Sequence, residues 1–280
     1  MIIWLASYPK SGNTWVRSIV SSLLYSDDGI FNFKLLHKID QFPEKKYFKD
    51  LINDFGNFDQ IKSNWIVAQD KINLDGKKKL FKTHQGKYTV GGDKFIDNSN
   101  TSGVIYIVRD PRTVVSSISN HYTLSIKESL EFMLSPSLIG NSLSFEEKKG
   151  GLLTLLGKWN EHYRSWTRIK ENLLLIKYED LLLNPYLEVE KIVSFLKKYF
   201  QFETNEKKIQ NILDSTSFNS LKKMENKDLF KEGVLNKETN SKVNFFNLGP
   251  KNNWKNLLDK EIVNSLQKNF AAEMKELNYL

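Results

Sequence analysis

Short apolar runs alternate along this chain with stretches of helical periodicity. The runs cover residues 2–6, 80–83, 104–108 and 173–176. After the first run, apolar residues recur at the i, i+3, i+4, i+7, i+8 spacing of a helix that packs on a sheet: Val16, Ile19, Val20, Leu23 and Leu24. This alternation predicts an α/β fold with a central, mostly parallel β-sheet flanked by helices.

Further helix signals follow two of the later runs. Asp110 with Pro111 and Asn184 with Pro185 are helix starts. A last helix is expected to carry the apolar residues Ile262, Val263, Leu266, Phe270 and Met274. Because no internal repeat or Pro- or Gly/Ser-rich linker interrupts the chain, we expect one domain over residues 1–280. Segments 26–75 and 225–245 lack a clear period and are expected over the carboxyl ends of the strands.

Charge and cysteine content limit the chemistry. The 280 residues hold 41 Lys and Arg against 33 Asp and Glu, a net charge of +8 that attracts anions such as nucleic acid, anionic lipid or a phosphorylated small molecule. There is no cysteine, which excludes disulfides, thiolate nucleophiles and zinc-thiolate sites.

The first apolar run is too short and has the wrong flanks for a signal peptide, and no later run approaches the roughly 18 apolar residues of a membrane span. We therefore expect a soluble, cytoplasmic protein.

A polar loop, residues 8–15, separates the first apolar run from the first helix. Its sequence is Tyr-Pro-Lys-Ser-Gly-Asn-Thr-Trp. Backbone N–H groups at such a helix start, with the positive end of the helix dipole, form a cradle for an anion, and Lys10 adds a cation. The loop lacks the Walker order of glycine and lysine, so by itself it is equally compatible with a generic turn.

A second polar segment follows the run at 104–108. Arg109 stands at the carboxyl end of this expected strand, and Ser116 and Ser117 lie in the following helix. An Arg in this place can bind a phosphate with two hydrogen bonds, or it can pair with the neighbouring Asp110. The segment alone leaves both interpretations open.

The two segments, in this order, resemble the cytosolic-type, 3′-phosphoadenosine 5′-phosphosulfate (PAPS)-dependent sulfotransferases. Residues 8–15 resemble the 5′-phosphosulfate loop of that family, and residues 105–117 resemble its 3′-phosphate motif. Further matches run in family order to about residue 256: Lys82-Thr83-His84; Trp159, His162 and Trp166; Tyr178-Glu179-Asp180 with Asn184-Pro185; Thr216-Ser217-Phe218; and Gly249 through Trp254-Lys255-Asn256.

The resemblance implies a P-loop-like architecture and transfer of a sulfuryl group from PAPS to a hydroxyl or amine. The acceptor would be a small molecule or a saccharide, without a metal, a nucleic-acid partner or a membrane. Lys10 would stabilise the leaving phosphate, His84 would be the general base, and Lys82 would contact the sulfuryl oxygens. The residues implied to bind the nucleotide are Lys10, Ser11, Gly12, Asn13, Thr14, Trp15, Arg109, Ser117, Tyr178, Thr216, Phe218, Asn247 and Gly249.

The chain has four histidines, and only His84 is expected at a strand end that faces the site. Lys82 and His84 share one face of an extended strand because side chains alternate along it. His37 and His121 are expected at the surface or in structural roles. His162 is expected to make hydrogen bonds within the core.

The chain departs from the family pattern before Gly249. Asn247 and Leu248 stand where the family usually has an Arg-Lys pair, so Asn247 cannot supply a charged contact to the 3′-phosphate. Lys242 or Lys251 could replace that charge. The family's short dimer motif is not found after Trp254, which leaves the oligomeric state open.

Two other classes of protein share some of these sequence features. A nucleotide kinase uses a similar strand, loop and helix, but its Walker glycines and magnesium-binding carboxylate are missing from the sequence. A basic nucleic-acid-binding protein would fit the net charge of +8 and the run Lys77-Lys78-Lys79, but no recognition motif accompanies that run. The sequence therefore predicts a sulfotransferase.

Overall fold

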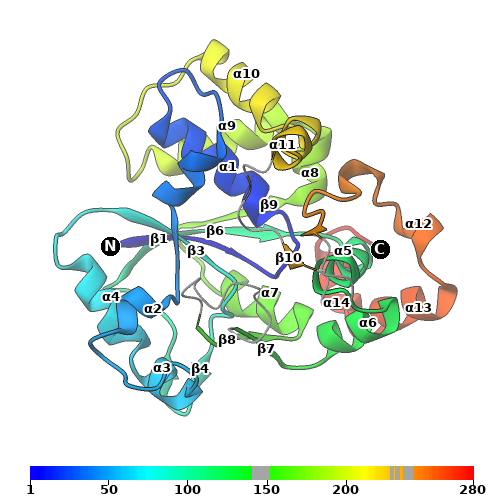
Figure 1. Ribbon diagram of the computed structural model, residues 1–280, viewed down its shortest axis with the longest axis horizontal. Coiled ribbons are helices and arrows are strands. Elements are labelled where there is room, and N and C mark those ends of the chain that lie inside the picture. Colours follow the sequence, from blue (N-terminus) through cyan, green and yellow to red (C-terminus); the bar gives the residue numbers. More distant parts are fainter. Residues whose placement is uncertain (141–151, 228–229, 231–233, 236–241) are drawn as a thin grey trace.

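Five parallel strands form the central sheet of the computed structural model (Figure 1). The structure describes residues 1–140, 152–227, 230, 234–235 and 242–280. In spatial order the strands are β2 (Asp40–Gln41), β3 (Lys79–Thr83), β1 (Ile2–Ser7), β6 (Thr101–Val108) and β9 (Leu173–Lys177). Every neighbouring pair is parallel. The predicted α/β fold with a central parallel sheet is confirmed.

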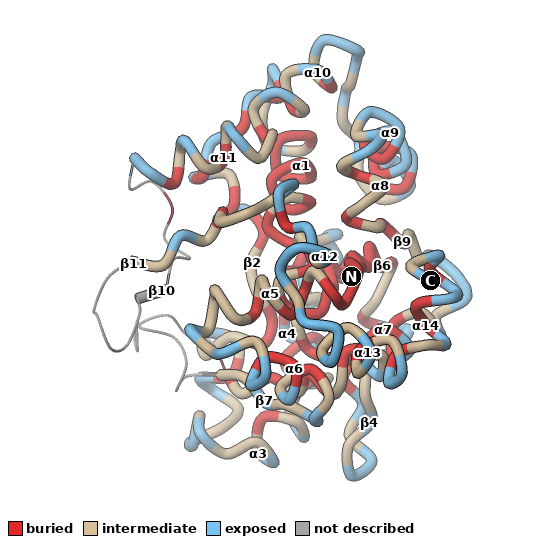
Figure 2. Tube along the Cα trace, turned by 90° about the vertical axis from the view of Figure 1, so that its right-hand side faces the viewer, coloured by how far each residue is buried: buried red, intermediate tan, exposed pale blue. Residues whose placement is uncertain are grey.

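Helices cover both faces of the sheet because the strands are apolar on both sides. In β1, Trp4 and Ala6 face one core and Ile3 and Leu5 face the other. The core with Ile3 is covered by α1 (Asn13–Tyr25), α9 (Pro185–Leu196) and α10 (Glu206–Ser215). The core with Trp4 is covered mainly by α4 (Trp65–Asn73), α5 (Pro111–Tyr122), α6 (Ile126–Leu134) and α7 (Trp159–Thr167). Figure 2 shows the buried residues running along α1 and around the sheet.

The remaining elements are short. The helices are α2 (Lys45–Phe48), α3 (Phe58–Ser63), α8 (Tyr178–Leu183), α11 (Phe218–Glu225) and α12 (Trp254–Leu257), with 3-10 turns η1 (Phe33–Lys38) and η2 (Gly249–Lys251). The described residues also form short antiparallel pairs that the apolar runs do not predict: β4 (Thr89–Val90) with β5 (Asp93–Lys94), β7 (Ser137–Ile139) with β8 (Thr154–Gly157), and β10 (Val234–Leu235) with β11 (Lys242–Val243).

The prediction of one last helix is wrong. The chain forms α13 (Lys260–Asn269) and α14 (Ala271–Glu276), and Phe270 between them has a non-helical backbone with φ −116° and ψ 18°. Phe270 is buried, and its ring centroid lies 5.1 Å from that of Trp159 in α7. The apolar spacing continues across the break, so periodicity alone could not reveal it.

The aromatic residues of segment 26–75 serve the core. Phe42, Phe48 and Trp65 are fully buried. Phe42 and Trp65 both contact the ring of Phe95, with centroid distances of 5.9 and 5.3 Å. These three side chains therefore pack the interior.

Within the described part of the chain, none of the helices has the length and apolar character needed to cross a membrane.

Candidate active site

The carboxyl ends of four neighbouring strands bring the predicted site residues together. His84 directly follows β3, Arg109 follows β6 and Tyr178 follows β9, while Lys10 lies three residues beyond the end of β1. The register aligns these ends, since Ala6 of β1 pairs with Thr83 on one side and with Tyr106 on the other. Parallel strands that end in register place their following residues at one edge, where α/β proteins bind ligands.

The loop before α1 turns sharply on two left-handed residues. Lys10 has φ 66° and Gly12 has φ 104°. A Cβ atom at Gly12 would lie 2.8 Å from the ring of Tyr178, so glycine is required here for both backbone angle and space. The start of α1 has no side-chain cap. The hydroxyl of Ser11 is buried and has no hydrogen-bond partner in the described part of the chain. A helix start with uncapped N–H groups and an unpartnered buried hydroxyl has the geometry that favours anion binding.

Asn13 uses its side chain to hold the loop to β1. Its amide nitrogen donates to the carbonyl of Leu5 at 3.0 Å and to Oγ of Ser7 at 3.2 Å, and the residue is buried. The amide nitrogen of Asn13 is therefore engaged by β1, whereas its amide oxygen is buried without a hydrogen-bond partner among the described residues. The sequence could not show this direction, since helical periodicity does not say which polar side chain turns inward.

The ammonium of Lys10 lies over an aromatic ring. Its Nζ is 3.6 Å from the ring centroid of Phe245, a cation–π contact. The backbone N–H groups of Phe245 and Phe246 donate to the buried carboxylate of Glu225 at 2.6 and 3.0 Å. Glu225 therefore fixes the segment that carries the ring against Lys10.

His84 is held through its ring. Its Nδ1 lies 2.8 Å from the carbonyl oxygen of Ser7 and 3.3 Å from the Ser7 hydroxyl. A carbonyl oxygen only accepts, so Nδ1 carries the proton of the neutral ring and the lone pair is on Nε2. This is the tautomer in which Nε2 can act as a base. Lys82 lies two residues earlier in β3, opposite Leu5, and is buried.

The ring of His162 connects β6 with the residue that follows β3. Its Nδ1 is 2.8 Å from the hydroxyl of Tyr106, and its Nε2 is 3.0 Å from the carbonyl oxygen of His84. Burial lowers the pKa of His162 to about 4, so the ring is neutral near pH 7. The expected hydrogen-bonding role of His162 in the core is confirmed. His37, in contrast, is exposed.

Arg109 is directed toward the loop rather than toward its neighbouring carboxylate. Its Nη1 donates to the carbonyl of Lys10 and to Oγ of Ser117, both at 3.3 Å. Asp110 instead pairs with Arg112 at 2.7 Å. The Nε of Arg109 is buried without a hydrogen-bond partner among the described residues. Of the two roles left open for Arg109, the geometry favours a phosphate ligand.

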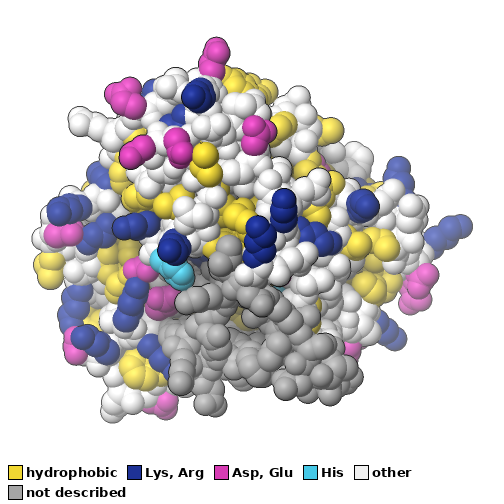
Figure 3. Space-filling model, turned by 45° about the horizontal axis from the view of Figure 1, so that its top comes forward, with side chains coloured by type: hydrophobic (Ala, Val, Ile, Leu, Met, Phe, Trp, Pro, Cys, Tyr) yellow, Lys and Arg dark blue, Asp and Glu magenta, His cyan; other side chains and the backbone are white. Residues whose placement is uncertain are grey.

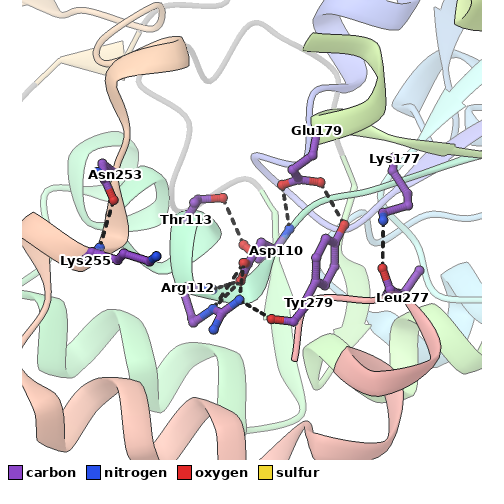
Figure 4. A network of polar contacts seen from close by, with 9 residues as sticks. All are labelled: Asp110, Arg112, Thr113, Lys177, Glu179, Asn253, Lys255, Leu277 and Tyr279. Carbon is purple, nitrogen blue, oxygen red and sulfur yellow. Dashed lines mark hydrogen bonds and ion pairs between the residues drawn. The ribbon is translucent and has the colours of Figure 1, made fainter. Parts of the chain in front are cut away.

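A polar network fixes the turn that carries Arg109 (Figure 4). The N–H of Asp110 donates to one carboxylate oxygen of Glu179 at 3.0 Å, and the hydroxyl of Tyr279 donates to the other at 2.8 Å. Arg112 donates to the carbonyl of Tyr279 at 2.5 Å. Burial raises the pKa of Glu179 above its usual range. The C-terminal segment thus joins the turns after β6 and β9.

Two of the three aromatic residues implied for the nucleotide border one apolar cluster. Trp15 and Phe218 both pack against the apolar group that contains Phe33 and Phe246. Gly249 has φ 52°, and a Cβ there would lie 2.2 Å from the ring of Phe218. The hydroxyl of Thr216, also implied for the nucleotide, donates to the carbonyl of Ile212 at 2.7 Å.

Lys222, which the sequence motifs do not indicate, contacts Asn247. Lys222 of α11 donates from Nζ to the carbonyl oxygen of Asn247 at 3.0 Å. The side-chain amide of Asn247 donates to Asn120, which is one helical turn beyond Ser117 in α5. Of the two lysines proposed as replacements, Lys251 is exposed and the side chain of Lys242 lies outside the described residues. The only sequence signal for Lys222 is its position four residues after Phe218.

Asn252 is a second residue of this corner that the motifs did not identify. Its amide nitrogen donates to Oγ of Ser117 at 3.2 Å and to the carbonyl of Thr113 at 2.9 Å. Its amide oxygen accepts from Ser116 at 2.9 Å. Asn252 thus orients the Ser117 hydroxyl beside Arg109.

Lys and Arg side chains are spread over the face shown in Figure 3, with a group of them near its centre. Among the described residues, no three His, Asp or Glu side chains gather in a way that could hold a metal ion.

Comparisons with known proteins identify the family. Residues 2–278 match the sulfotransferase domain family. Cytosolic sulfotransferase 7 of Arabidopsis thaliana is 25% identical over 93% of this chain and 74% of its own length. Sulfotransferase 1B1 of Canis lupus familiaris is 27% identical over 91% of this chain and 77% of its own length.

Solved structures share the fold. A mouse sulfotransferase complexed with PAP aligns with a TM-score of 0.62 and 21% identity, over 98% of this chain and 84% of the other. A retinol dehydratase in complex with retinol and PAP aligns with a TM-score of 0.60 and 19% identity, over 98% and 81% of the two chains. The chain therefore belongs to the sulfotransferase domain family and is a PAPS-dependent sulfotransferase.

Proposed function

We propose that the chain transfers a sulfuryl group from PAPS to a hydroxyl or amine of a small-molecule acceptor, with His84 as the general base. The observation that carries this assignment is the bond from His84 Nδ1–H to the carbonyl of Ser7, at 2.8 Å. It leaves the lone pair on Nε2 and ties the ring to the end of the strand that also supplies the Lys10 loop.

The residues at the strand ends suit a nucleotide with two separate phosphate groups. The N–H groups at the start of α1 and the buried Ser11 hydroxyl fit the 5′ end. Arg109, whose buried Nε has no partner among the described residues, fits the 3′-phosphate together with Ser117. Trp15, Tyr178 and Phe218 offer aromatic faces for the base. PAPS supplies the sulfuryl group and leaves as adenosine 3′,5′-bisphosphate (PAP).

In the transfer step, the acceptor oxygen or nitrogen forms a bond to sulfur as the bond from sulfur to the 5′-phosphate oxygen breaks. Nε2 of His84 takes the acceptor proton. Negative charge grows on the leaving phosphate, where the Lys10 ammonium and the loop N–H groups stabilise it. Lys82 is assigned to the sulfuryl oxygens. These roles of chain residues require no metal ion.

The relatives of this chain act, by their names, on acceptors of different chemical classes. Similar proteins include a 3-beta-hydroxysteroid sulfotransferase and an amine sulfotransferase, at 28% and 24% identity. We therefore propose a small molecule with a hydroxyl or amine, with a saccharide as a further class to test. Because a similar protein is a cytosolic sulfotransferase by name, we also propose a cytoplasmic location. The family match favours sulfuryl transfer over the kinase and nucleic-acid alternatives.

The test is transfer of labelled sulfuryl from PAPS to a panel of one phenol, one hydroxysteroid, one arylalkylamine and one amino sugar. His84→Asn should abolish turnover on the best acceptor while the Kd of PAP stays unchanged, because Asn cannot take the proton. Lys10→Met should lower kcat by about 100- to 1,000-fold, the usual effect of removing one group that stabilises transition-state charge. His37→Asn, at an exposed histidine, is the control and should behave as wild type. Full activity of His84→Asn would overturn the assignment of the base.

A further inference from the structure

Helix α7 binds the chain segment that follows β3 at three points. Nε2 of His162 contacts the carbonyl of His84, and Nε1 of Trp166 donates to the carbonyl of Gln85, both at 3.0 Å. Oγ of Ser165 accepts from the N–H of Lys87 at 3.0 Å. One helix therefore holds the backbone of residues 84–87, and of these three contacts the one from His162 is to His84 itself.

The donor and the acceptor in each hydrogen bond of the His162 ring can be assigned. The carbonyl of His84 only accepts, so Nε2 of His162 carries the proton and Nδ1 must accept. The hydroxyl of Tyr106, 2.8 Å from Nδ1, therefore donates to it. Tyr106 of β6 therefore fixes the tautomer of His162.

The environment keeps His162 in that neutral state. His162 is fully buried, and Tyr106 is 1% exposed. Burial lowers the pKa of His162 to about 4, and its ring packs edge-on to Tyr8 at a centroid distance of 5.6 Å. Loss of its Nε2–H would leave the carbonyl of His84 without this donor in a water-poor interior, where an unmade hydrogen bond is costly.

We propose that His162 is a positioning residue for the sulfuryl transfer: it fixes the backbone of His84 while the carbonyl of Ser7 fixes the ring. With the backbone held by the bond at 3.0 Å and Nδ1 held by the bond at 2.8 Å, the direction of Nε2 is set. A general base must stay within hydrogen-bond reach of the proton it removes, so a displacement of about 1 Å can cost up to about 100-fold in rate. The inference rests on the proposed role of His84 as the base.

The experiment compares four variants in the full chain. His162→Met removes both ring nitrogens at similar side-chain length, whereas His162→Gln keeps an amide N–H that can reach the carbonyl of His84. Tyr106→Phe removes the donor to Nδ1. Ser165→Ala, the matched control, removes the contact of the same helix with Lys87 and the bond from the Ser165 hydroxyl to the His162 carbonyl, but leaves the rings of His162 and His84 unchanged. Each variant is assayed for kcat, KM for PAPS, Kd of PAP and melting temperature.

His162→Met should lower kcat by about 10- to 100-fold, with KM for PAPS and Kd of PAP near wild type, because the nucleotide is held by other strand ends. His162→Gln should restore most of kcat, Tyr106→Phe should give an intermediate loss, and Ser165→Ala should keep kcat close to wild type. In the background of His84→Asn, His162→Met should leave turnover at the same background level.

The tautomer of His84 can also be measured without an acceptor substrate, because the chain has only four histidines. Ring nitrogen NMR of the four histidines should show His84 as a single Nδ1–H tautomer in the wild type and in His162→Gln, and as a mixture in His162→Met. An unchanged His84 tautomer and unchanged kcat in a folded His162→Met would overturn the positioning role. If His84→Asn still abolishes turnover in that case, the proposed function stands; if His84→Asn is active, the base assignment itself fails.

Discussion

The guanidinium of Arg109 lies over the ring of Tyr178, with 4.0 Å between its central carbon and the ring centroid. Gly12 approaches the same ring so closely that a Cβ would be 2.8 Å away, and Trp15 contacts its edge with centroids 5.5 Å apart. One aromatic ring from the end of β9 therefore positions both the loop after β1 and the Arg after β6. The two proposed phosphate sites share this support.

Replacement of Tyr178 should weaken nucleotide binding through Arg109. A partly desolvated cation–π contact contributes about 0.5–2 kcal/mol, so Tyr178→Leu should raise the Kd of PAP by about 2- to 30-fold. Tyr178→Phe keeps the ring and should bind PAP like wild type. Calorimetric titration with PAP measures both. Equal weakening in the two variants would show that the hydroxyl, rather than the ring, is responsible.

Asn247 has no charge to offer the 3′-phosphate, so the preference for PAP over nucleotides without that phosphate should be weak unless Lys222 supplies the positive charge. A charge-assisted hydrogen bond contributes about 1.5–3 kcal/mol and a neutral one about 0.5–1.5 kcal/mol. Lys222→Met should therefore reduce the preference for PAP over adenosine 5′-monophosphate, and Asn247→Arg should restore it in that background. Lys251→Met, at an exposed lysine, is the control. If Lys222→Met leaves the preference unchanged, Lys222 is not the replacement cation.

Stability should fall in mildly acidic solution because of His162. Burial lowers its pKa to about 4 in the folded state, against about 6.5 in the unfolded chain. Between these values the unfolded state binds more protons, so the free energy of unfolding decreases as pH falls through that window, by up to about 3 kcal/mol from this residue. Urea unfolding at pH 7 and pH 4.5 measures the loss. His162→Gln should lose less stability over the same change, and an identical loss would contradict the assignment.

Chelation should leave sulfuryl transfer intact. Lys10 and the N–H groups at the start of α1 are assigned to the charge of the leaving phosphate, so excess EDTA should change kcat little. The assay is transfer of labelled sulfuryl with and without EDTA on the same acceptor. A loss that added magnesium restores would point instead to the kinase alternative.

The sequence predicts the elements that carry the site because their signals are local. Apolar runs identify the principal strands, and the strand ends place Lys10, His84, Arg109 and Tyr178 at one edge of a parallel sheet. The order of motifs along the chain is a linear property, and it was sufficient to predict the family that the comparisons show.

Tertiary structure alone decides which polar groups meet. His162 contacts the carbonyl of His84 across 78 residues of chain, and Lys222 contacts that of Asn247 across 25. Helical or strand periodicity states which face of an element is apolar, but a hydrogen bond between elements also depends on their packing distance and rotation. The break at Phe270 has the same origin, since its ring packs on Trp159 while the apolar spacing runs on unchanged. Local patterns therefore determined the sheet and the residues at its edge, and packing between distant segments determined how those residues are held.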